Sequence, residues 1–406
     1  MKNVTQILVT FMATALLWTA CQKVDDTDPN ANLKEKVVEN YATIVHASYE
    51  ASHQTAVALQ TAIHTLVDQP SAANLLAAKT AWKAAREPYG QTEAYRFYDG
   101  PIDDENGPEG ALNAWPLDEN YIDYTTDASG VITNTGIIAD ATTYPTINAT
   151  VLAGLNEQGG EKNISIGYHA IEFLLWGQDY MDVNINAGQG GDRPYTDFTS
   201  TASDYQRRGE YIKACAQLLV DDLETLVTAW AEGGAYRSSF MALSADDALS
   251  KILTGAGVLS KSELAGERIF VALEANASDN PQEDEHSCFS DNTNRDVITN
   301  AQGITNILKG TFVRPNGITA GNTEEGILAL LTKVDATASA ELTAANTDAM
   351  FKVASIPNPF DKTVTEESIG DNGPVLQAVT ALQKQGDEIA EAATALGLTI
   401  STELPD

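Results

Sequence analysis

Basic residues, histidines and cysteines are all scarce in this chain of 406 residues. It has 24 lysines and arginines against 57 aspartates and glutamates, which gives a formal net charge of −33. Nucleic acids and anionic lipid surfaces would repel such a chain, so neither is an expected partner. The acidic balance is compatible with attracting cations, although solvated surface is the commoner reason for acidic residues.

The three cysteines, Cys21, Cys215 and Cys288, are too few for a disulfide framework. One bridge between Cys215 and Cys288 remains open in an oxidising compartment, whereas the helical pattern around Cys215 is typical of a small buried residue. After the first 21 residues, no apolar run is long enough to span a bilayer.

The first 21 residues form a segment of their own. Lys2 precedes an apolar run over 7–18, and Thr19-Ala20-Cys21 supplies small residues that end in cysteine. This pattern is similar to a bacterial lipoprotein signal, with an ordinary secretory signal as the alternative. We therefore expect cleavage before Cys21 and lipid on that residue, which would anchor the chain to the outer membrane, on its periplasmic or its surface-exposed face.

Apolar residues recur at helical spacing along most of the chain, and strand-like alternation is scarce. The pattern predicts an all-α fold in two four-helix-bundle-like domains, residues 33–235 and 236–406, related by structural duplication and preceded by a linker over 22–32. The expected helices cover 33–67, 71–97, 167–179, 204–230, 245–273, 297–308, 324–352 and 373–396.

Two segments without helical periodicity, 99–146 and 281–295, combine turn-forming residues with carboxylates. Loops of this length in a compact domain are usually functional or disordered. The aromatic residues of 99–146 favour an ordered loop.

An unusual pair of polar residues stands inside an apolar stretch, where His169 precedes Glu172 by three positions. On a helix the two side chains share one face. An imidazole and a carboxylate in apolar surroundings form either a hydrogen-bonded core pair or half of a metal site. From the spacing alone, the core pair is the commoner outcome.

Gly167 extends this pair to G-x-H-x-x-E, which resembles the motif of the imelysin family. The resemblance covers roughly residues 35 to 400 and is closest to the iron-regulated protein A branch of imelysin-like lipoproteins. It implies two helical domains with a site in the crevice between them, in a family catalogued as peptidases that includes iron-regulated and iron-uptake proteins. The matching segments are 96–104, 113–118, 191–195, 266–270 and 286–292.

The family motif transfers only to Gly167, His169 and Glu172, and some iron-transport relatives carry a glutamate that Glu93 matches. Iron(III) prefers oxygen ligands and tolerates imidazole, so carboxylates on the following loop could complete a site. The candidate metal ligands are therefore His169, Glu172, Glu93, Asp99 and Asp103, and the further candidates for the cleft are Gly167, Arg96, His286 and Asp291.

His286, Asp291 and Asn292 form a second candidate cluster in the 281–295 loop. The alternative is a turn and capping network, because Ser290, Asp291 and Asn292 are typical capping residues just before a predicted helix. The residue types favour the capping network.

These features predict a cell-envelope lipoprotein that binds iron, or an iron-containing ligand, for uptake. Another divalent cation is not excluded, and an outer-membrane transporter is a candidate partner.

The alternative is a metal-dependent peptidase acting on extracellular protein, although the chain lacks H-E-x-x-H, lacks H-x-x-E-H because Phe173 follows Glu172, and lacks G-x-S-x-G. We therefore do not expect an enzyme. A third hypothesis is an adhesion or assembly module in which His169 and Glu172 are structural.

Overall fold

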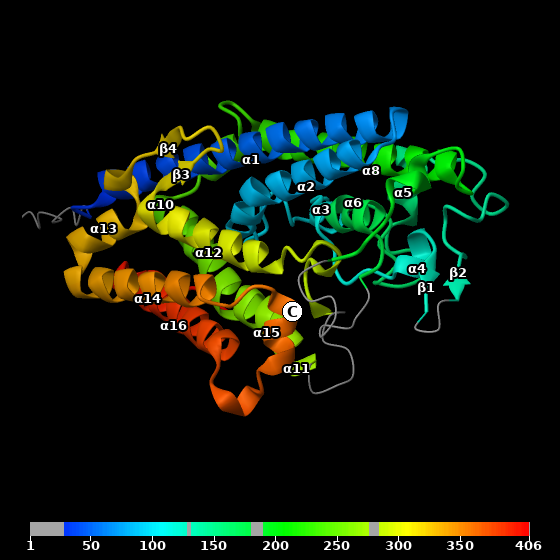
Figure 1. Cartoon of the computed structure of the whole chain (residues 1–406). Helices are drawn as coiled ribbons and strands as arrows, with labels where there is room; N and C mark the ends of the chain where they lie inside the picture. Colours follow the sequence, from blue (N-terminus) through cyan, green and yellow to red (C-terminus); the bar gives the residue numbers. More distant parts are fainter. Residues whose placement is uncertain (1–27, 128–130, 180–189, 276–283, 406) are drawn as a thin grey trace, which may run out of the picture.

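The computed structural model describes residues 28–127, 131–179, 190–275 and 284–405, so the leader and Cys21 lie outside the described residues. Helices make up most of the described chain, which confirms the all-α prediction (Figure 1). Within these ranges the strands form two short antiparallel pairs. These are β1 (Thr125–Thr126) with β2 (Ile132–Thr133) and β3 (Thr311–Val313) with β4 (Thr319–Gly321).

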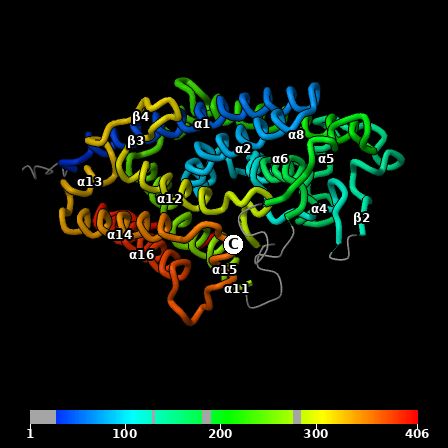
Figure 2. The backbone as a smooth tube through the Cα atoms, in the orientation of Figure 1, coloured from blue at the N-terminus to red at the C-terminus, as the bar shows by residue number. Residues whose placement is uncertain are grey.

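The longest helix, α1 (Ala31–Asp68), runs along the upper side of the molecule from the end near α13 to the end near α5 (Figure 2). It packs against α2 (Ala72–Thr92) and α8 (Tyr205–Trp230). The Ser71 hydroxyl accepts a hydrogen bond from the Asn74 amide and so caps α2 at its N-terminus. Beneath this layer lies α6 (Gly167–Trp176), in contact with α2 and α8.

The predicted loop at 99–146 is ordered over its described residues. It contains the one-turn helices α3 (Glu109–Leu112) and α4 (Glu119–Ile122), and α5 (Ala149–Leu155) follows it. The α3 helix contacts both α6 and α8, so this loop forms part of the wall around α6.

The other side of the molecule is built on a helix that changes its winding. The α10 helix (Ala245–Val258) continues through a π-helical segment, η3 (Leu259–Phe270), into α11 (Val271–Ala275). A regular helix was expected over 245–273, and hydrophobic periodicity cannot reveal the extra residue per turn. The η3 segment packs against α16 (Pro374–Ala395).

One predicted helix, 324–352, is two helices in the structure: α13 (Ile327–Val334) and α14 (Ala336–Ala354). The break is at Asp335, whose side chain accepts hydrogen bonds from the Thr337 and Ala338 amides and so caps α14. The chain then forms the short α15 (Phe360–Glu366) before α16.

The predicted loop over 310–323 forms the β3–β4 hairpin, which covers part of α1. Asn40 of α1 holds it, because its side-chain amide donates to the carbonyl oxygens of Gly310, Asn322 and Glu325 at 2.8, 3.1 and 3.1 Å. The two hydrogens of one amide group are thus shared among three backbone carbonyl oxygens.

The α12 helix (Thr293–Lys309) lies between the two sides and packs against α2, η3 and α14 (Figure 1). The hydrophobic core is continuous across residue 235, where α9 (Ala235–Met241) begins. The division into domains at 235/236 and the structural duplication stay predictions.

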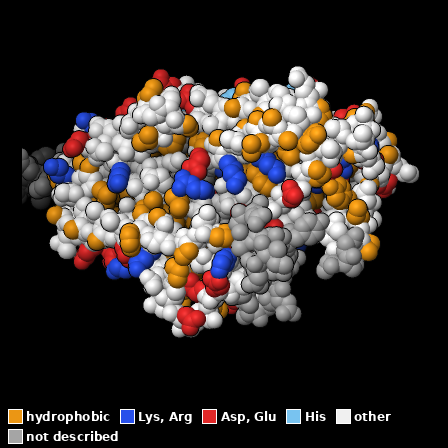
Figure 3. Space-filling view, viewed as in Figure 1, with side chains coloured by type: hydrophobic (Ala, Val, Ile, Leu, Met, Phe, Trp, Pro, Cys, Tyr) orange, Lys and Arg blue, Asp and Glu red, His pale blue; other side chains and the backbone are white. Residues whose placement is uncertain are grey.

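Two further expectations can be compared with the fold. Cys215 and Cys288 are both buried free thiols, so the bridge left open by the sequence is not formed. No helix in the described ranges is both long and apolar enough to cross a membrane. On the face shown in Figure 3, basic, acidic and hydrophobic side chains alternate in small groups.

Candidate functional site

The α6 helix is buried along its whole length, and its first residue explains the glycine of the motif. Gly167 has a φ of +88°, and a Cβ built on it would lie 2.7 Å from the Ala111 carbonyl oxygen and 2.8 Å from that of Leu112. Any other residue would therefore be strained and would collide with the α3 backbone. Gly167 lets α6 start directly against α3, which fixes the position of His169 two residues later.

His169 and Glu172 form a buried hydrogen-bonded pair, with 1% and 0% of their surfaces exposed. The distance between His169 Nδ1 and Glu172 Oε2 is 2.9 Å. The other carboxylate oxygen, Oε1, accepts hydrogen bonds from the Ser290 amide at 3.0 Å and the Ser290 hydroxyl at 2.7 Å. His169 Nδ1 and both carboxylate oxygens of Glu172 are therefore hydrogen-bonded within the protein. The buried His169 Nε2, in contrast, has no hydrogen-bond partner.

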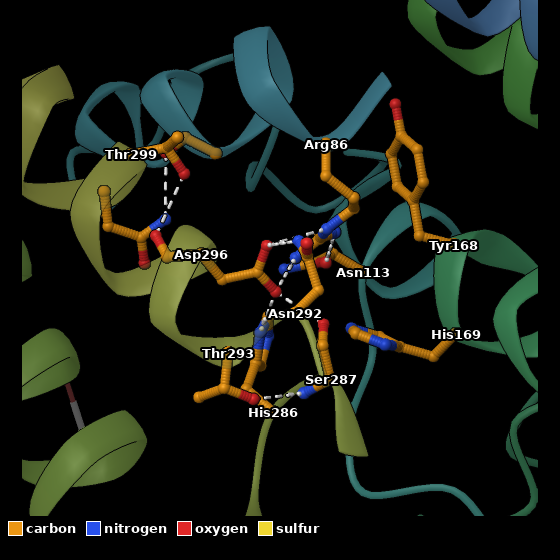
Figure 4. Close-up of polar contacts among 12 residues, drawn as sticks. Arg86, Asn113, Tyr168, His169, His286, Ser287, Asn292, Thr293, Asp296 and Thr299 are labelled. Atoms are coloured by element: carbon orange, nitrogen blue, oxygen red, sulfur yellow. Dashed lines mark hydrogen bonds and ion pairs between the residues drawn. The ribbon is translucent and has the colours of Figure 1, made fainter. Parts of the chain in front are cut away.

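A second imidazole–carboxylate pair faces the first. His286 Nδ1 lies 3.1 Å from Asp296 Oδ2, and the His286 and His169 rings are 4.8 Å apart between centroids in an edge-to-face arrangement. Figure 4 shows the two imidazoles near one another, with Asp296 on the far side of His286. Each histidine therefore has its Nδ1 held by a carboxylate, an arrangement that fixes the ring and leaves Nε2 for another group.

Asp296, in the first turn of α12, makes most of the hydrogen bonds and the ion pair around the second histidine. Its carboxylate binds the Arg86 guanidinium of α2 through two contacts, at 3.2 and 2.9 Å, and also accepts from the Ser287 hydroxyl and the Asn292 side-chain amide. Arg86 in turn donates to Asn113 Oδ1 at 2.6 Å. The dashed contacts in Figure 4 follow this chain from Asn113 to His286.

Aromatic side chains enclose the polar groups. The Trp115 ring lies 5.0 Å from the His169 ring and 5.7 Å from the Phe289 ring, and the Arg86 guanidinium lies 5.0 Å from the Tyr168 ring centroid. Trp115 Nε1 is a second buried donor without a partner. The site is thus shielded from bulk solvent, so its unpaired polar atoms are costly unless a ligand or an ordered water binds them.

Burial sets the protonation of the first pair. It lowers the pKa of His169 well below its ordinary value, and it raises the pKa of Glu172 to about 8, although hydrogen bonds from Ser290 partly oppose this. At neutral pH both side chains are therefore uncharged. The Glu172 carboxyl then donates to Nδ1 and His169 Nε2 carries a proton; loss of one proton from the pair reverses the hydrogen bond and exposes a lone pair on Nε2.

The second pair is charged differently. Burial, together with the nearby Arg268 charge, lowers the pKa of His286. Burial alone would raise the pKa of Asp296, but the Arg86 charge outweighs it and holds that pKa well below the usual range. Asp296 is thus an ionised carboxylate that orients a neutral His286.

Glu93, a predicted ligand, is engaged elsewhere in this structure. Its carboxylate forms ion pairs with Arg96 at 3.0 Å and with Arg268 of η3 at 2.7 Å. Burial would raise the pKa of Glu93, but the charges of Arg268 and Arg96 outweigh it and lower the pKa to about 2. Glu93 reaches the histidine pair only indirectly, through Asn113 Nδ2 at 3.4 Å and then Arg86.

The other two predicted carboxylates lie in a separate groove. Asp99 is exposed, and Asp103 accepts hydrogen bonds from the Phe97 and Gly100 amides. With Arg96 they line an open groove of about 530 Å³. In the part of the chain that the structure describes, no three histidine, cysteine, aspartate or glutamate side chains are placed to hold one metal ion. The five predicted ligands are therefore not gathered into one cluster.

The 286–292 cluster differs from both sequence interpretations. His286 is beside His169, as a cleft residue should be, but its partner is Asp296 rather than Asp291. The favoured capping network is wrong for two of its members, because Asn292 makes no capping hydrogen bond to α12 and Ser290 binds Glu172.

Sequence reasoning missed Arg86, Asp296 and Trp115. Arg86 had no distinctive signal, because Lys79, Lys83 and Glu87 stand near it on the same helix and the sequence does not show which of these charged residues is buried. Trp115 lies in the matching segment 113–118, but nothing in the sequence placed its ring against His169. Asp296 had no signal, because only the packing of α12 against α2 brings it to the histidines.

Comparison with known proteins identifies the family and the fold of this chain. The sequence profile of the imelysin family matches residues 45–390. The chain is 28% identical over 321 residues to iron-regulated protein A of Synechococcus elongatus, covering 77% of this chain and 72% of that protein. It also superimposes on a crystal structure from Parabacteroides distasonis, described as an iron-regulated protein A precursor, with a TM-score of 0.70 at 19% identity, covering 91% of this chain and 97% of that one. That identity supports the fold alone. The matched profile spans most of the chain, and the protein is therefore a member of the imelysin family.

Proposed function

We propose that this protein binds iron, or an iron-containing ligand, at the histidine pair formed by His169 and His286. The observation that carries the proposal is the pair itself: two neutral imidazoles, 4.8 Å apart between ring centroids, each held at Nδ1 by a carboxylate. The buried, unpartnered Nε2 of His169 supplies a ligand atom once the His169–Glu172 pair releases one proton, so metal binding at this atom would be coupled to proton release. The iron-related name of a relative covering most of this chain supports the choice of metal.

The donor set favours one kind of cargo over another. Imidazole suits iron(II) better than the harder iron(III), which prefers oxygen ligands. Because no three described protein donors converge, the remaining ligands would come from water or from the cargo itself. An iron chelate that brings its own oxygen atoms therefore fits better than bare iron(III).

A role in uptake from the cell envelope belongs to the same proposal. The Thr19-Ala20-Cys21 pattern supports a lipid anchor on Cys21 in the outer membrane, with a transporter in that membrane as the partner that receives the iron. Palmitate labelling in a bacterial host, comparing the full chain with Cys21→Ala, tests the anchor: label on the first and none on the second is expected. Equal labelling would refute it.

A metal-dependent peptidase remains the second candidate, favoured by the catalogued name of the family rather than by geometry. Incubation of the purified chain with insulin B chain tests it. Cleavage that a chelator abolishes, and that His169→Ala also abolishes, would support the peptidase over the binding protein.

The binding proposal is tested by isothermal titration of the purified chain with anaerobic ferrous ammonium sulfate, ferric citrate and haemin in turn. We expect one of these to bind with a 1:1 stoichiometry, and binding to weaken at least tenfold in His169→Ala and in His286→Ala. His64→Ala is the matched control, because His64 is an exposed histidine of α1. Equal affinity in all four proteins, or no binding by any, would refute the proposal.

A further inference from the structure

A buried arginine away from the histidine pair has a donor atom that the described protein does not use. The Arg193 side chain is 1% exposed, and its guanidinium carbon lies 5.0 Å from the Tyr124 ring centroid and 5.3 Å from that of Phe173. Its Nη1 donates to Asp123 at 2.7 Å and to Asp197 at 3.1 Å. Its Nε is buried and has no hydrogen-bond partner. A buried donor of a charged group is costly to leave unbound, so this atom requires an acceptor.

A small cavity lies beside this atom, between Arg193 and the C-terminal end of α6. Its volume is about 50 Å³, which is room for roughly three or four water-sized groups. Gly177, the first residue after α6, lines the cavity with a φ of +75°, and a Cβ built on it would lie 3.6 Å from Arg193 Nε. The absence of a side chain at Gly177 therefore leaves space next to the unpartnered donor.

Positive charge gathers next to the cavity. Trp176, which lines it, has two ammonium groups over its ring, Lys79 Nζ at 5.2 Å and Lys83 Nζ at 5.8 Å from the ring centroid. None of the described ion pairs includes either lysine. Among the described residues that line the cavity, only Asp192 is acidic, and it is exposed.

The buried carboxylates nearby do not offset these lysines. Arg208 binds Asp123 through Nε at 2.7 Å, in addition to the contact from Arg193. Two arginines therefore already balance Asp123 and Asp197. The lysine charges are in excess at this place, in a chain that is strongly acidic as a whole.

We propose that this cavity binds the carboxylate group of a small organic acid, of the size of formate or acetate, with Arg193 Nε as its main donor. Hydrogen bonds between a guanidinium and a carboxylate are charge-assisted and roughly twice as strong as neutral ones. Gln178, which also lines the cavity, supplies a second donor. Its side-chain oxygen accepts from the Thr126 amide at 2.9 Å, and none of the described hydrogen bonds uses its NH₂ group.

Other occupants fit this cavity less well. A cation would be repelled by Arg193 and by the lysines over Trp176. Water would satisfy Arg193 Nε but would leave the excess positive charge uncompensated. Phosphate is larger than the roughly three or four groups that the cavity admits. Neither histidine of the pair lines the cavity, so carboxylate binding here does not depend on the iron proposal.

The test follows the acetate methyl signal by saturation-transfer difference NMR on the full chain, titrated in a constant sodium chloride background. We expect a saturable signal that formate displaces and that phosphate displaces at least tenfold less well. No saturable signal with acetate or formate at tens of millimolar would overturn the proposal. Equal displacement by phosphate and formate would overturn the assignment to a carboxylate.

Two variants locate the binding. Arg193→Lys keeps a cation for Asp123 and Asp197 but removes Nε, so acetate affinity should fall at least tenfold. Gln178→Glu keeps the acceptor for the Thr126 amide and replaces the NH₂ group by a negative oxygen, so affinity should fall at least fivefold even if Arg193→Lys does not fold. Unchanged affinity in Gln178→Glu would overturn the proposal.

Two controls separate this binding from general charge effects and from the iron site. Gln158→Glu places the same new charge on an exposed residue and should keep the wild-type acetate affinity. The His169→Ala/His286→Ala protein should also keep it, so failure of the iron proposal and failure of this one are distinguishable. An equal loss of affinity in Gln158→Glu and Gln178→Glu would place the acetate outside this cavity and overturn the proposal.

Discussion

The histidine pair and the groove of Asp99 and Asp103 contrast in how their charges are satisfied. At the histidine pair the groups are buried, the imidazoles are neutral, and His169 Nε2 and Trp115 Nε1 lack partners. Beside the groove, the charges are paired: Arg96 forms ion pairs with Glu93 and Glu109 through Nη1, although its buried Nε lacks a partner, and Asp103 accepts from two backbone amides. Unsatisfied buried atoms are costly unless a ligand uses them, whereas satisfied ion pairs are explained by the fold. The first region therefore has the properties of a binding site, and the second those of a scaffold.

The largest expected loss of stability comes from removing the arginine that neutralises the buried Asp296 carboxylate. Arg86→Met would leave Asp296 buried without its cation, which should cost about 3–5 kcal/mol of unfolding free energy, measured by urea denaturation. Arg295→Met is the comparison, since the Arg295–Glu87 pair has side chains 50% and 41% exposed and should cost less than about 1 kcal/mol. Equal losses would show that the Arg86–Asp296 pair is not the buried anchor described above.

The next effect should appear at the glycine of the motif. Gly167→Ala places a Cβ against the Ala111 and Leu112 carbonyls at a positive φ and should destabilise the fold by about 1–3 kcal/mol, while weakening ligand binding through displacement of His169. Gly154→Ala meets no atom within 4 Å and lies inside α5, so it should be neutral or stabilising by up to about 1 kcal/mol. The melting temperatures of both variants, compared with that of the wild type, test these two expectations. A Gly167→Ala protein as stable as the wild type would contradict the steric argument.

An effect of similar size should appear in the pH dependence of stability. The pKa of Glu172 is raised from 4.5 to about 8, so between these values the folded protein holds a proton that the unfolded chain has lost. This contribution to stability therefore falls as pH rises from about 4.5 to 8, on the order of a few kcal/mol. Glu172→Gln cannot titrate, and its urea unfolding free energy should decline less between pH 5 and 8. Parallel declines in the two proteins would be evidence against a protonated Glu172.

The smallest effect is expected in the groove. Asp99→Asn changes an exposed side chain, so stability should change by less than about 0.5 kcal/mol and iron-ligand affinity by less than about twofold, measured by titration calorimetry. A tenfold loss of affinity would restore Asp99 as a ligand and place the binding site in the second region.

Much of the fold could be predicted from the sequence because it depends on local periodicity. The all-α class, the Ser71 cap and the helices near 33–67, 204–230 and 373–396 all follow from apolar spacing and capping residues. The π-helical η3 and the break at Asp335 did not follow, because the same hydrophobic residues suit a regular helix. The hairpin over α1 depends on Asn40, more than 250 residues away in sequence, and such a distant contact leaves no local signal.

The site residues, like the fold, could be predicted only where the contact is between residues close in sequence. His169 and Glu172 share one helical face, so their spacing of three residues was enough to predict that they could form a pair. His286 was identified as a candidate, but its true partner Asp296 lies one helical turn inside α12, where only the packing against Arg86 reveals it. Glu93 was chosen for its place on the second helix, but Arg96, three residues later, and Arg268, from a distant part of the chain, neutralise it.

The most direct test of the histidine pair is a crystal of the iron-loaded protein measured at the iron absorption edge. The account predicts an anomalous difference peak within coordination distance of His169 Nε2, with His286 beside it. A peak at Asp99 and Asp103, with nothing at His169, would contradict it.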